Sequence, residues 1–150
     1  MPRERKQGVA GGADIRPRDC YIGPMETSLA LYRGEAVLFS SGGKWLHPLF
    51  ELEQFLSSSG LDAADLRVRD KIVGKAAALL LVRLGLRRVD AGVLSAPARA
   101  VLEAHAVRYS FETLVERVAC RTEELLRGID DPQAAYAITR DLAEKSRRSA

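Results

Sequence analysis

The stretch that decides the fold is residues 66–97, LRVRDKIVGKAAALLLVRLGLRRVDAGVLSAP. It opens with Leu66-Arg67-Val68, which alternates like a short strand, and Asp70 then stands where a helix cap is expected. Residues 72–82 are apolar around nearly the whole helical circumference. This pattern predicts a central helix that other elements cover on most sides.

The same alternation of strand and helix continues after this helix. Gly85 is placed to end it, residues 88–94 have the composition of a buried strand, and Ser95-Ala96-Pro97 opens a second helix that runs to about His105. Residues 107–109 predict another strand. The next residue is Ser110, which predicts a capped helix because apolar side chains follow it at helical spacing: Phe111, Leu114, Val115, Val118 and Ala119.

The two ends of the domain are marked by turn residues. Residues 29–39 form two apolar runs around Gly34, which predicts an antiparallel hairpin. Pro48 can occupy a first helical turn, and the helix that follows should stop at Ser57-Ser58-Ser59-Gly60. Gly128 is expected to end the helix that Ser110 begins, and Asp131-Pro132 to start a last one.

A hairpin followed by helices alternating with strands predicts an α/β fold with a mixed sheet. We expect helices on both faces, which makes a three-layer α/β/α sandwich. The 150 residues are enough for one core, so we expect a single domain over 21–150 with a C-terminal helix.

The basic net charge of +3 lies mostly in the first residues. Residues 1–19 carry five basic and three acidic side chains, which leaves 18 basic against 17 acidic over residues 20–150. Residues 1–20 therefore predict a disordered basic leader, and no nucleic-acid partner is expected. No apolar run is long enough to span a bilayer, so we expect a cytoplasmic protein without a membrane partner. Cys20 and Cys120 allow at most one disulfide, and we expect free thiols.

The run from Asp70 to Leu81, followed by Val93-Leu94-Ser95-Ala96-Pro97-Ala98, resembles the domain of unknown function 1893 family. The resemblance extends from about Leu29 to about Arg121. It implies a cytidine deaminase-like fold, since that family is placed in the cytidine deaminase-like superfamily. Of the family's last motifs only Arg121 carries over, because this chain lacks the Asn-Arg pair and the Cys-Pro-Met-Glu stretch.

The chain lacks the zinc-binding motifs of active deaminases, which are His-x-Glu and Pro-Cys-x-x-Cys at two successive helix starts. Pro97-Ala98-Arg99-Ala100 stands in place of the second motif, and His47 and His105 lie far from both positions. Without metal ligands no water is activated. We therefore expect no metal, no cofactor and no zinc-dependent deamination.

What remains is the frame of an anion site. Two helix N-termini, expected to begin at Asp70 and Ser95, should converge at the carboxyl ends of the strands. Lys71 and Lys75 would share one face of the central helix, and Gly74 would let a ligand approach the backbone. The predicted ligand-binding residues are Asp70, Lys71, Gly74, Lys75 and Ser95, with Arg121 added by the resemblance. Lys75 is expected to be exposed, so its replacement by Ala should weaken anion binding and leave the fold intact.

Each of these residues also has a structural explanation. Asp70 and Ser95 are common helix caps, Lys75 can extend its ammonium from an apolar helix to water, and Gly74 can permit close packing. Trp45, beside Gly42-Gly43, resembles either a lid or a packing anchor, and we leave it outside the predicted site.

Three functions follow from these observations. The first is a zinc-free, deaminase-like protein that binds a nucleotide or related phosphate-bearing ligand as a sensor or regulator. The second is a metal-independent enzyme acting on such a ligand, with Asp70 or Glu103 as acid or base. The third is a protein-interaction scaffold. We favour the first, because no activated nucleophile and no close carboxylate pair can be recognised; a homo-oligomer is compatible with all three.

Overall fold

The structure is a computed structural model that describes residues 27–118 and 121–149. Two expectations fall outside these residues. They are the disordered leader over 1–20 and the state of Cys20 and Cys120.

The fold begins with the predicted hairpin. Strand β2 (Leu29–Arg33) pairs antiparallel with β3 (Ala36–Ser41), which confirms the reading of two apolar runs around a glycine. Gly34 lies in the turn with φ +61°, a left-handed conformation that glycine adopts without the steric penalty of a side chain.

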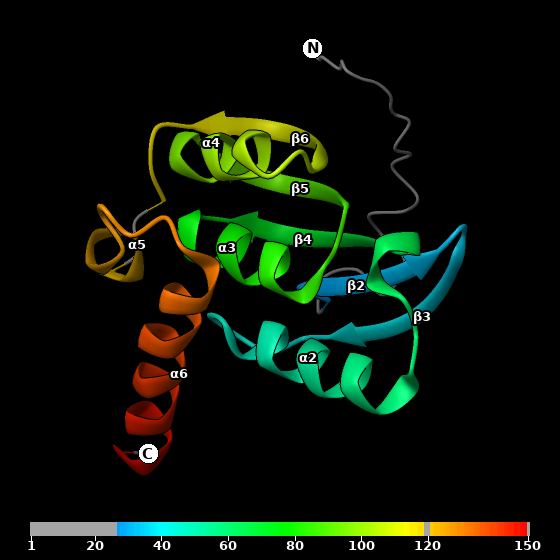
Figure 1. The fold of residues 1–150 in the computed structure, drawn as a ribbon, viewed down its shortest axis with the longest axis horizontal. Helices are drawn as coiled ribbons and strands as arrows, with labels where there is room; N and C mark the ends of the chain where they lie inside the picture. Colours follow the sequence, from blue (N-terminus) through cyan, green and yellow to red (C-terminus); the bar gives the residue numbers. More distant parts are fainter. Residues whose placement is uncertain (1–26, 119–120, 150) are drawn as a thin grey trace.

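The hairpin joins three parallel strands in one five-stranded sheet of order β3-β2-β4-β5-β6 (Figure 1). Strand β4 (Arg67–Val73) is antiparallel to β2 and parallel to β5 (Arg88–Ser95), and β6 (Arg108–Val115) extends the parallel part. The prediction of a mixed sheet in an α/β fold is therefore confirmed.

Four longer helices accompany the sheet. They are α2 (His47–Ser59), α3 (Lys75–Leu84), α4 (Ala96–Ala104) and α6 (Pro132–Ser149), with a 3-10 turn η1 (Ala63–Asp65) and a short helix α5 (Arg121–Leu125) between them. The predicted ends of two helices are confirmed, since Gly60 and Gly85 adopt left-handed conformations directly after α2 and α3.

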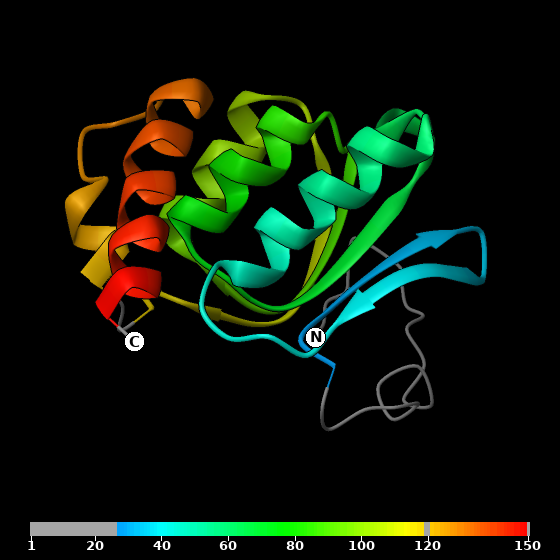
Figure 2. The same ribbon diagram turned by 90° about the horizontal axis from the view of Figure 1, so that it is seen from below.

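In the described part of the chain the helices lie on one side of the sheet, as the turned view shows (Figure 2). The handedness of the connections explains this. The crossovers through α2, α3 and α4 each step in the same direction along the strand order, and right-handed connections of that kind place their helices on the same face. The expected third layer is thus absent from residues 27–118 and 121–149.

Helix α3 is the central helix, as predicted. Its first seven residues, Lys75–Leu81, are all buried, because α3 packs on the sheet on one side and against α4 and α6 on others. The core around it consists mainly of leucine, valine and alanine side chains from the strands and helices.

Two predicted elements are wrong. Asp70 does not cap α3: it lies inside β4, paired with Leu29 of β2 and Ala91 of β5, and Gly74 takes the cap position. Strand pairing on both sides outweighs the low strand preference of aspartate. The expectation that Lys71 and Lys75 share a helical face fails with it, since Lys71 belongs to β4.

The second error concerns the helix predicted from Ser110. The chain there forms β6, which pairs with β5 from Arg88↔Arg108 to Ser95↔Val115. The spacing of Phe111, Leu114 and Val115 imitates a helix, but the backbone partners offered by β5 and the aromatic and β-branched side chains favour a strand.

Candidate functional site

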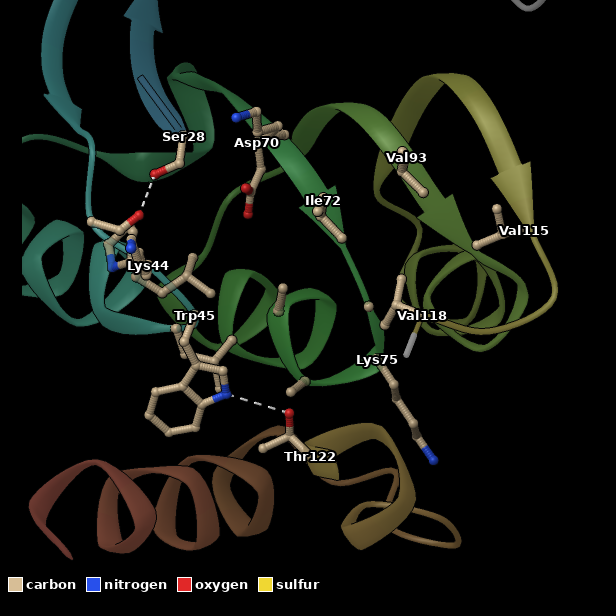
Figure 3. A pocket seen from close by; sticks show the side chains of 18 of the residues that line it. Ser28, Lys44, Trp45, Asp70, Ile72, Lys75, Val93, Val115, Val118 and Thr122 are labelled. Atoms are coloured by element: carbon tan, nitrogen blue, oxygen red, sulfur yellow. Dashed lines mark hydrogen bonds between the residues drawn. The ribbon is translucent and has the colours of Figure 1, made fainter. Parts of the chain in front are cut away.

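A pocket of about 630 Å³ lies at the carboxyl ends of the parallel strands, where ligands bind in open α/β sheets. The loop after β3 borders it on one side and α5 on another (Figure 3). Its lining comes from distant parts of the chain: Ser28; Gly43, Lys44, Trp45, Leu46, Pro48 and Leu49; Asp70, Lys71, Ile72, Gly74, Lys75, Ala76 and Ala77; Val93; Val115; and Arg117, Val118 and Thr122.

Most of the lining is apolar. Ile72, Val93, Val115 and Val118 extend along the strand ends on one side, and Trp45 lies on the other (Figure 3). Leu46 and Leu49 also line the pocket. Such a surface suits the flat face or edge of an organic ring.

An irregularity in the sheet shapes this lining. Asp70 and Val73 are both buried although they are three residues apart, so the strict alternation of β4 is interrupted between them, and Ile72 is 53% exposed. At the same level of β5, a Cβ on Gly92 would come within 2.6 Å of the Lys71 carbonyl oxygen. Glycine at position 92 therefore permits the close approach of the two strands beside the pocket.

The pocket carries positive charge at its rim. Lys44, Lys71 and Arg117 line it, and all three are exposed. They come from different segments, namely the loop after β3, strand β4 and the segment after β6. An anion in the pocket would be attracted by all of them.

The N-terminus of α3 lies at the same place. Gly74, Lys75, Ala76 and Ala77 line the pocket, and the first intrahelical bond runs from the N–H of Ala78 to the carbonyl of Gly74. The N–H groups of a first helical turn point toward the helix start and favour an anion there. Gly74 has no side chain that caps them.

Asp70 is the acidic group of the pocket. Its side chain is directed into the pocket, and the residue is only 8% exposed (Figure 3). Burial raises the pKa of Asp70 from 3.8 to about 7, although hydrogen bonding by the backbone of Ile72 and Lys71 acts to lower it. The carboxyl group is thus partly protonated near neutral pH.

Lys75 lines the pocket, but its ammonium group binds the segment between α5 and α6. Its Nζ donates to the carbonyl of Leu126 and forms an ion pair with Asp130, each at 3.0 Å. Its side chain is 10% exposed, so the expectation of an exposed lysine is wrong. Lys75 ties α3 to the segment that joins α5 and α6.

Ser95 does not line the pocket, contrary to expectation. Ser95 is fully buried, and its Oγ accepts from the N–H of Ala98, which confirms it as the cap of α4. The start of α4 therefore lies outside the pocket, in contrast to the predicted convergence of two helix N-termini. Arg121 begins α5, and its side chain is outside the described part of the structure.

Glu103, the other carboxylate considered as an acid or base, lies on α4 away from the pocket. It accepts a hydrogen bond from Tyr109, which lowers the pKa of Glu103, and pairs with Arg99. These contacts hold it on the surface.

The loop before α2 supplies the residues that sequence reasoning left out. Trp45 adopts φ +59° and donates from Nε1 to Thr122 Oγ1 at 3.5 Å, across the pocket (Figure 3). Ser28 Oγ donates to the Gly43 carbonyl at 2.8 Å and holds the start of the loop. In the sequence, the pair Gly42-Gly43 beside Trp45 was the one sign that this loop could belong to a site. Only the folded structure, which brings the loop close to the start of α3, shows that Lys44 and Trp45 line a pocket.

No group of three or more His, Cys, Asp or Glu side chains is arranged to hold a metal ion within residues 27–118 and 121–149. Over the same residues, no helix combines the length and the hydrophobicity needed to cross a membrane.

Comparison with known proteins places the chain in a family. A family model described as a domain of unknown function, DUF1893, matches residues 24–143. Among solved structures, the chain is similar to the crystal structure of a DUF1893 family protein from Thermotoga maritima, at 28% sequence identity and a TM-score of 0.69. That similarity covers 77% of this chain and 80% of the other. No curated protein matches the chain. The pocket and the sheet described above are therefore those of a chain that belongs to the DUF1893 family.

Proposed function

We propose that this protein binds a nucleotide or a related phosphate-bearing small molecule, as a sensor or regulator. The observation that carries the proposal is a single pocket in which the first turn of α3, three exposed cations and an apolar lining meet. The cations and the helix start suit a phosphate, and the apolar lining suits a ring.

The dimensions of the pocket agree with this ligand class. A volume of about 630 Å³ is within the range of roughly 300 to 1,000 Å³ that is usual for small-molecule sites. The helix start and the apolar side chains belong to the same cavity, so one molecule can contact both.

We further propose that the fold is a zinc-free variant of the cytidine deaminase-like type. Helices α3 and α4 follow the parallel strands β4 and β5, and active zinc deaminases carry their ligands at two such helix starts. Here those positions hold Gly74-Lys75 and Ser95-Ala96-Pro97. Residues of these types supply no zinc ligand.

Thermal melting with a panel of nucleoside monophosphates and diphosphates tests the binding proposal. A ligand at about a hundred times its dissociation constant stabilises the fold by about 2.7 kcal/mol, and each kcal/mol raises the Tm of a domain of this size by roughly 2 to 4 °C. We expect a shift of several degrees. Lys44→Ala and Lys71→Ala should reduce the shift, because both side chains are exposed at the pocket.

Arg33→Ala provides the matched control. Arg33 is an exposed cation at the end of β2 and is not part of the pocket lining. Its replacement changes the net charge equally and should leave the ligand-induced shift unchanged. Equal shifts in all variants would place the binding elsewhere, and no shift with any nucleotide would favour the scaffold.

One observation supports the enzyme as a second candidate. The pKa of Asp70 is raised to about 7 inside the pocket, which is the range in which a general acid or base works best at neutral pH. Incubation of the protein with each stabilising nucleotide, followed by chromatography, separates the two functions. Product formation that Asp70→Asn abolishes would establish the enzyme.

A further inference from the structure

The unusual feature of the pocket is a buried acid without a cationic partner. Asp70 is 8% exposed, lines the pocket and lies in the middle of the sheet, between Leu29 of β2 and Ala91 of β5. Within residues 27–118 and 121–149, no lysine or arginine forms an ion pair with it. Burial without such a partner disfavours the ionised form and makes the neutral acid easier to form than in an exposed carboxyl group.

The charged groups near the pocket do not change this conclusion. On the neighbouring strands, Asp70 has the apolar partners Leu29 and Ala91. On α3, the ammonium of Lys75 is held by Asp130 and the Leu126 carbonyl.

The remaining charges are at the rim. Lys44 from the loop after β3, Lys71 from β4 itself and Arg117 from the segment after β6 are exposed, and water screens their effect on a buried group.

We propose that Asp70 recognises the ring of the bound ligand as a neutral carboxylic acid, which donates its O–H to a ring nitrogen and accepts from an adjacent amino group. The ligand class is then a phosphorylated aminopurine or aminopyrimidine, such as an adenine or cytosine nucleotide. This inference rests on the proposed function, because it concerns the same pocket.

The hydrogen-bonding pattern of the acid gives the reason. A protonated carboxyl group offers one donor and one acceptor side by side, whereas an ionised one offers acceptors only. Adenine presents the acceptor N1 beside its amino group, and cytosine presents N3 beside its own. The pairing leaves no buried polar group of the acid without a partner.

The phosphate of the same ligand also favours the protonated form of Asp70. A phosphate at the start of α3 is close enough to repel an ionised Asp70 within one pocket, so binding favours the protonated acid. Binding of the nucleotide is therefore accompanied by proton uptake from the solvent. The ionised acid cannot make the donor contact, so affinity decreases as the pH rises.

Calorimetric titration in two buffers with different ionisation enthalpies measures this proton uptake. At about pH 8, nearly all Asp70 is ionised in the free protein. The ligand phosphate has a second pKa of about 6 and no longer titrates at this pH. Binding of AMP or CMP should therefore be accompanied by the uptake of close to one proton per molecule bound. Affinity should decrease about tenfold per pH unit above about pH 7.

The informative variant is Asp70→Asn, because its amide keeps one donor and one acceptor in the same shape but has no proton to gain. It should bind AMP or CMP without proton uptake and with an affinity that does not change above about pH 7. Asp65→Asn is the matched control: Asp65 is exposed in η1, and its variant should behave like the wild type.

The possible results separate this inference from the function on which it rests. If the wild type binds AMP or CMP but takes up no more protons at about pH 8 than the phosphate itself requires, the neutral acid is refuted and nucleotide binding stands. Loss of binding in a folded Asp70→Asn protein, or tighter binding of GMP, whose edge offers two neighbouring donors, would refute it equally. If no nucleotide binds the wild type, the proposed function fails and this inference with it.

Discussion

Replacing Asp70 by Asn should make the unliganded protein more stable above neutral pH. The pKa of Asp70 is raised from 3.8 to about 7, a shift of about three units, and each unit corresponds to 1.36 kcal/mol. Because the folded-state pKa is the higher one, the folded protein binds the proton more tightly than the unfolded chain. This contribution to stability is complete below about pH 4, decreases as the pH rises and is lost above about pH 7.

The wild type should therefore lose up to about 4 kcal/mol, relative to the variant, between about pH 4 and pH 8. The amide replaces one carboxylate oxygen and weakens the hydrogen bonding by the backbone of Ile72 and Lys71, which costs about 1 kcal/mol at every pH. We thus expect the variant to be slightly less stable than the wild type at about pH 4 and more stable by about 3 kcal/mol at about pH 8.

Urea unfolding at both pH values, with the free energy of unfolding extrapolated to zero urea, measures the effect. The difference between the two proteins cancels the titration of all other carboxyl groups. Asp65→Asn, at an exposed position, should show no such dependence. A difference between wild type and Asp70→Asn that is the same at both pH values would show that Asp70 is not held in a desolvated site.

Three further changes test other parts of the structure. Gly92→Ala should lower the free energy of unfolding, measured with urea, by more than about 2 kcal/mol, because its Cβ would come within 2.6 Å of the Lys71 carbonyl oxygen. Gly60→Ala is the control: its Cβ would have open space, so it should cost only about 1 to 2 kcal/mol for the left-handed backbone. Lys75→Met should destabilise the protein by about 1 to 3 kcal/mol and increase the hydrogen exchange of α6, since it removes the ammonium that binds the Leu126 carbonyl and Asp130; unchanged exchange in α6 would contradict this role. Metal analysis of the purified protein should find well under about one zinc per chain, because no three-ligand set exists among the described residues, and a tightly held stoichiometric zinc would refute this prediction.

The local sequence was sufficient where a residue's conformation depends on its near neighbours. The hairpin around Gly34, the helix stops at Gly60 and Gly85 and the cap at Ser95 all follow from steric and hydrogen-bonding properties that act within a few residues. The central position of α3 followed as well, because a helix that is apolar on nearly every face has to be covered.

The local sequence failed where a distant strand decided the outcome. Asp70 resembles a helix cap by type and position, yet β2 and β5 pair with it from both sides and extend β4 to Val73. Phe111 and Leu114 have helical spacing, yet β5 offers the partners for a strand. Hydrogen bonds between strands depend on segments far apart in the chain, which a local pattern cannot contain.

The candidate site divides in the same way. The sequence by itself predicted an anion site where the central helix begins, and it pointed to Gly74, Lys71 and Asp70, all of which line the pocket. Only the tertiary structure decided their roles. It brought Lys44 and Trp45 from the loop after β3 to the same pocket, engaged Lys75 with Asp130, and enclosed Asp70 between two strands. The physical reason is that charge and hydrogen-bonding capacity belong to a residue type, whereas burial and partners, which set a pKa and the access of a ligand, arise only when distant segments pack together.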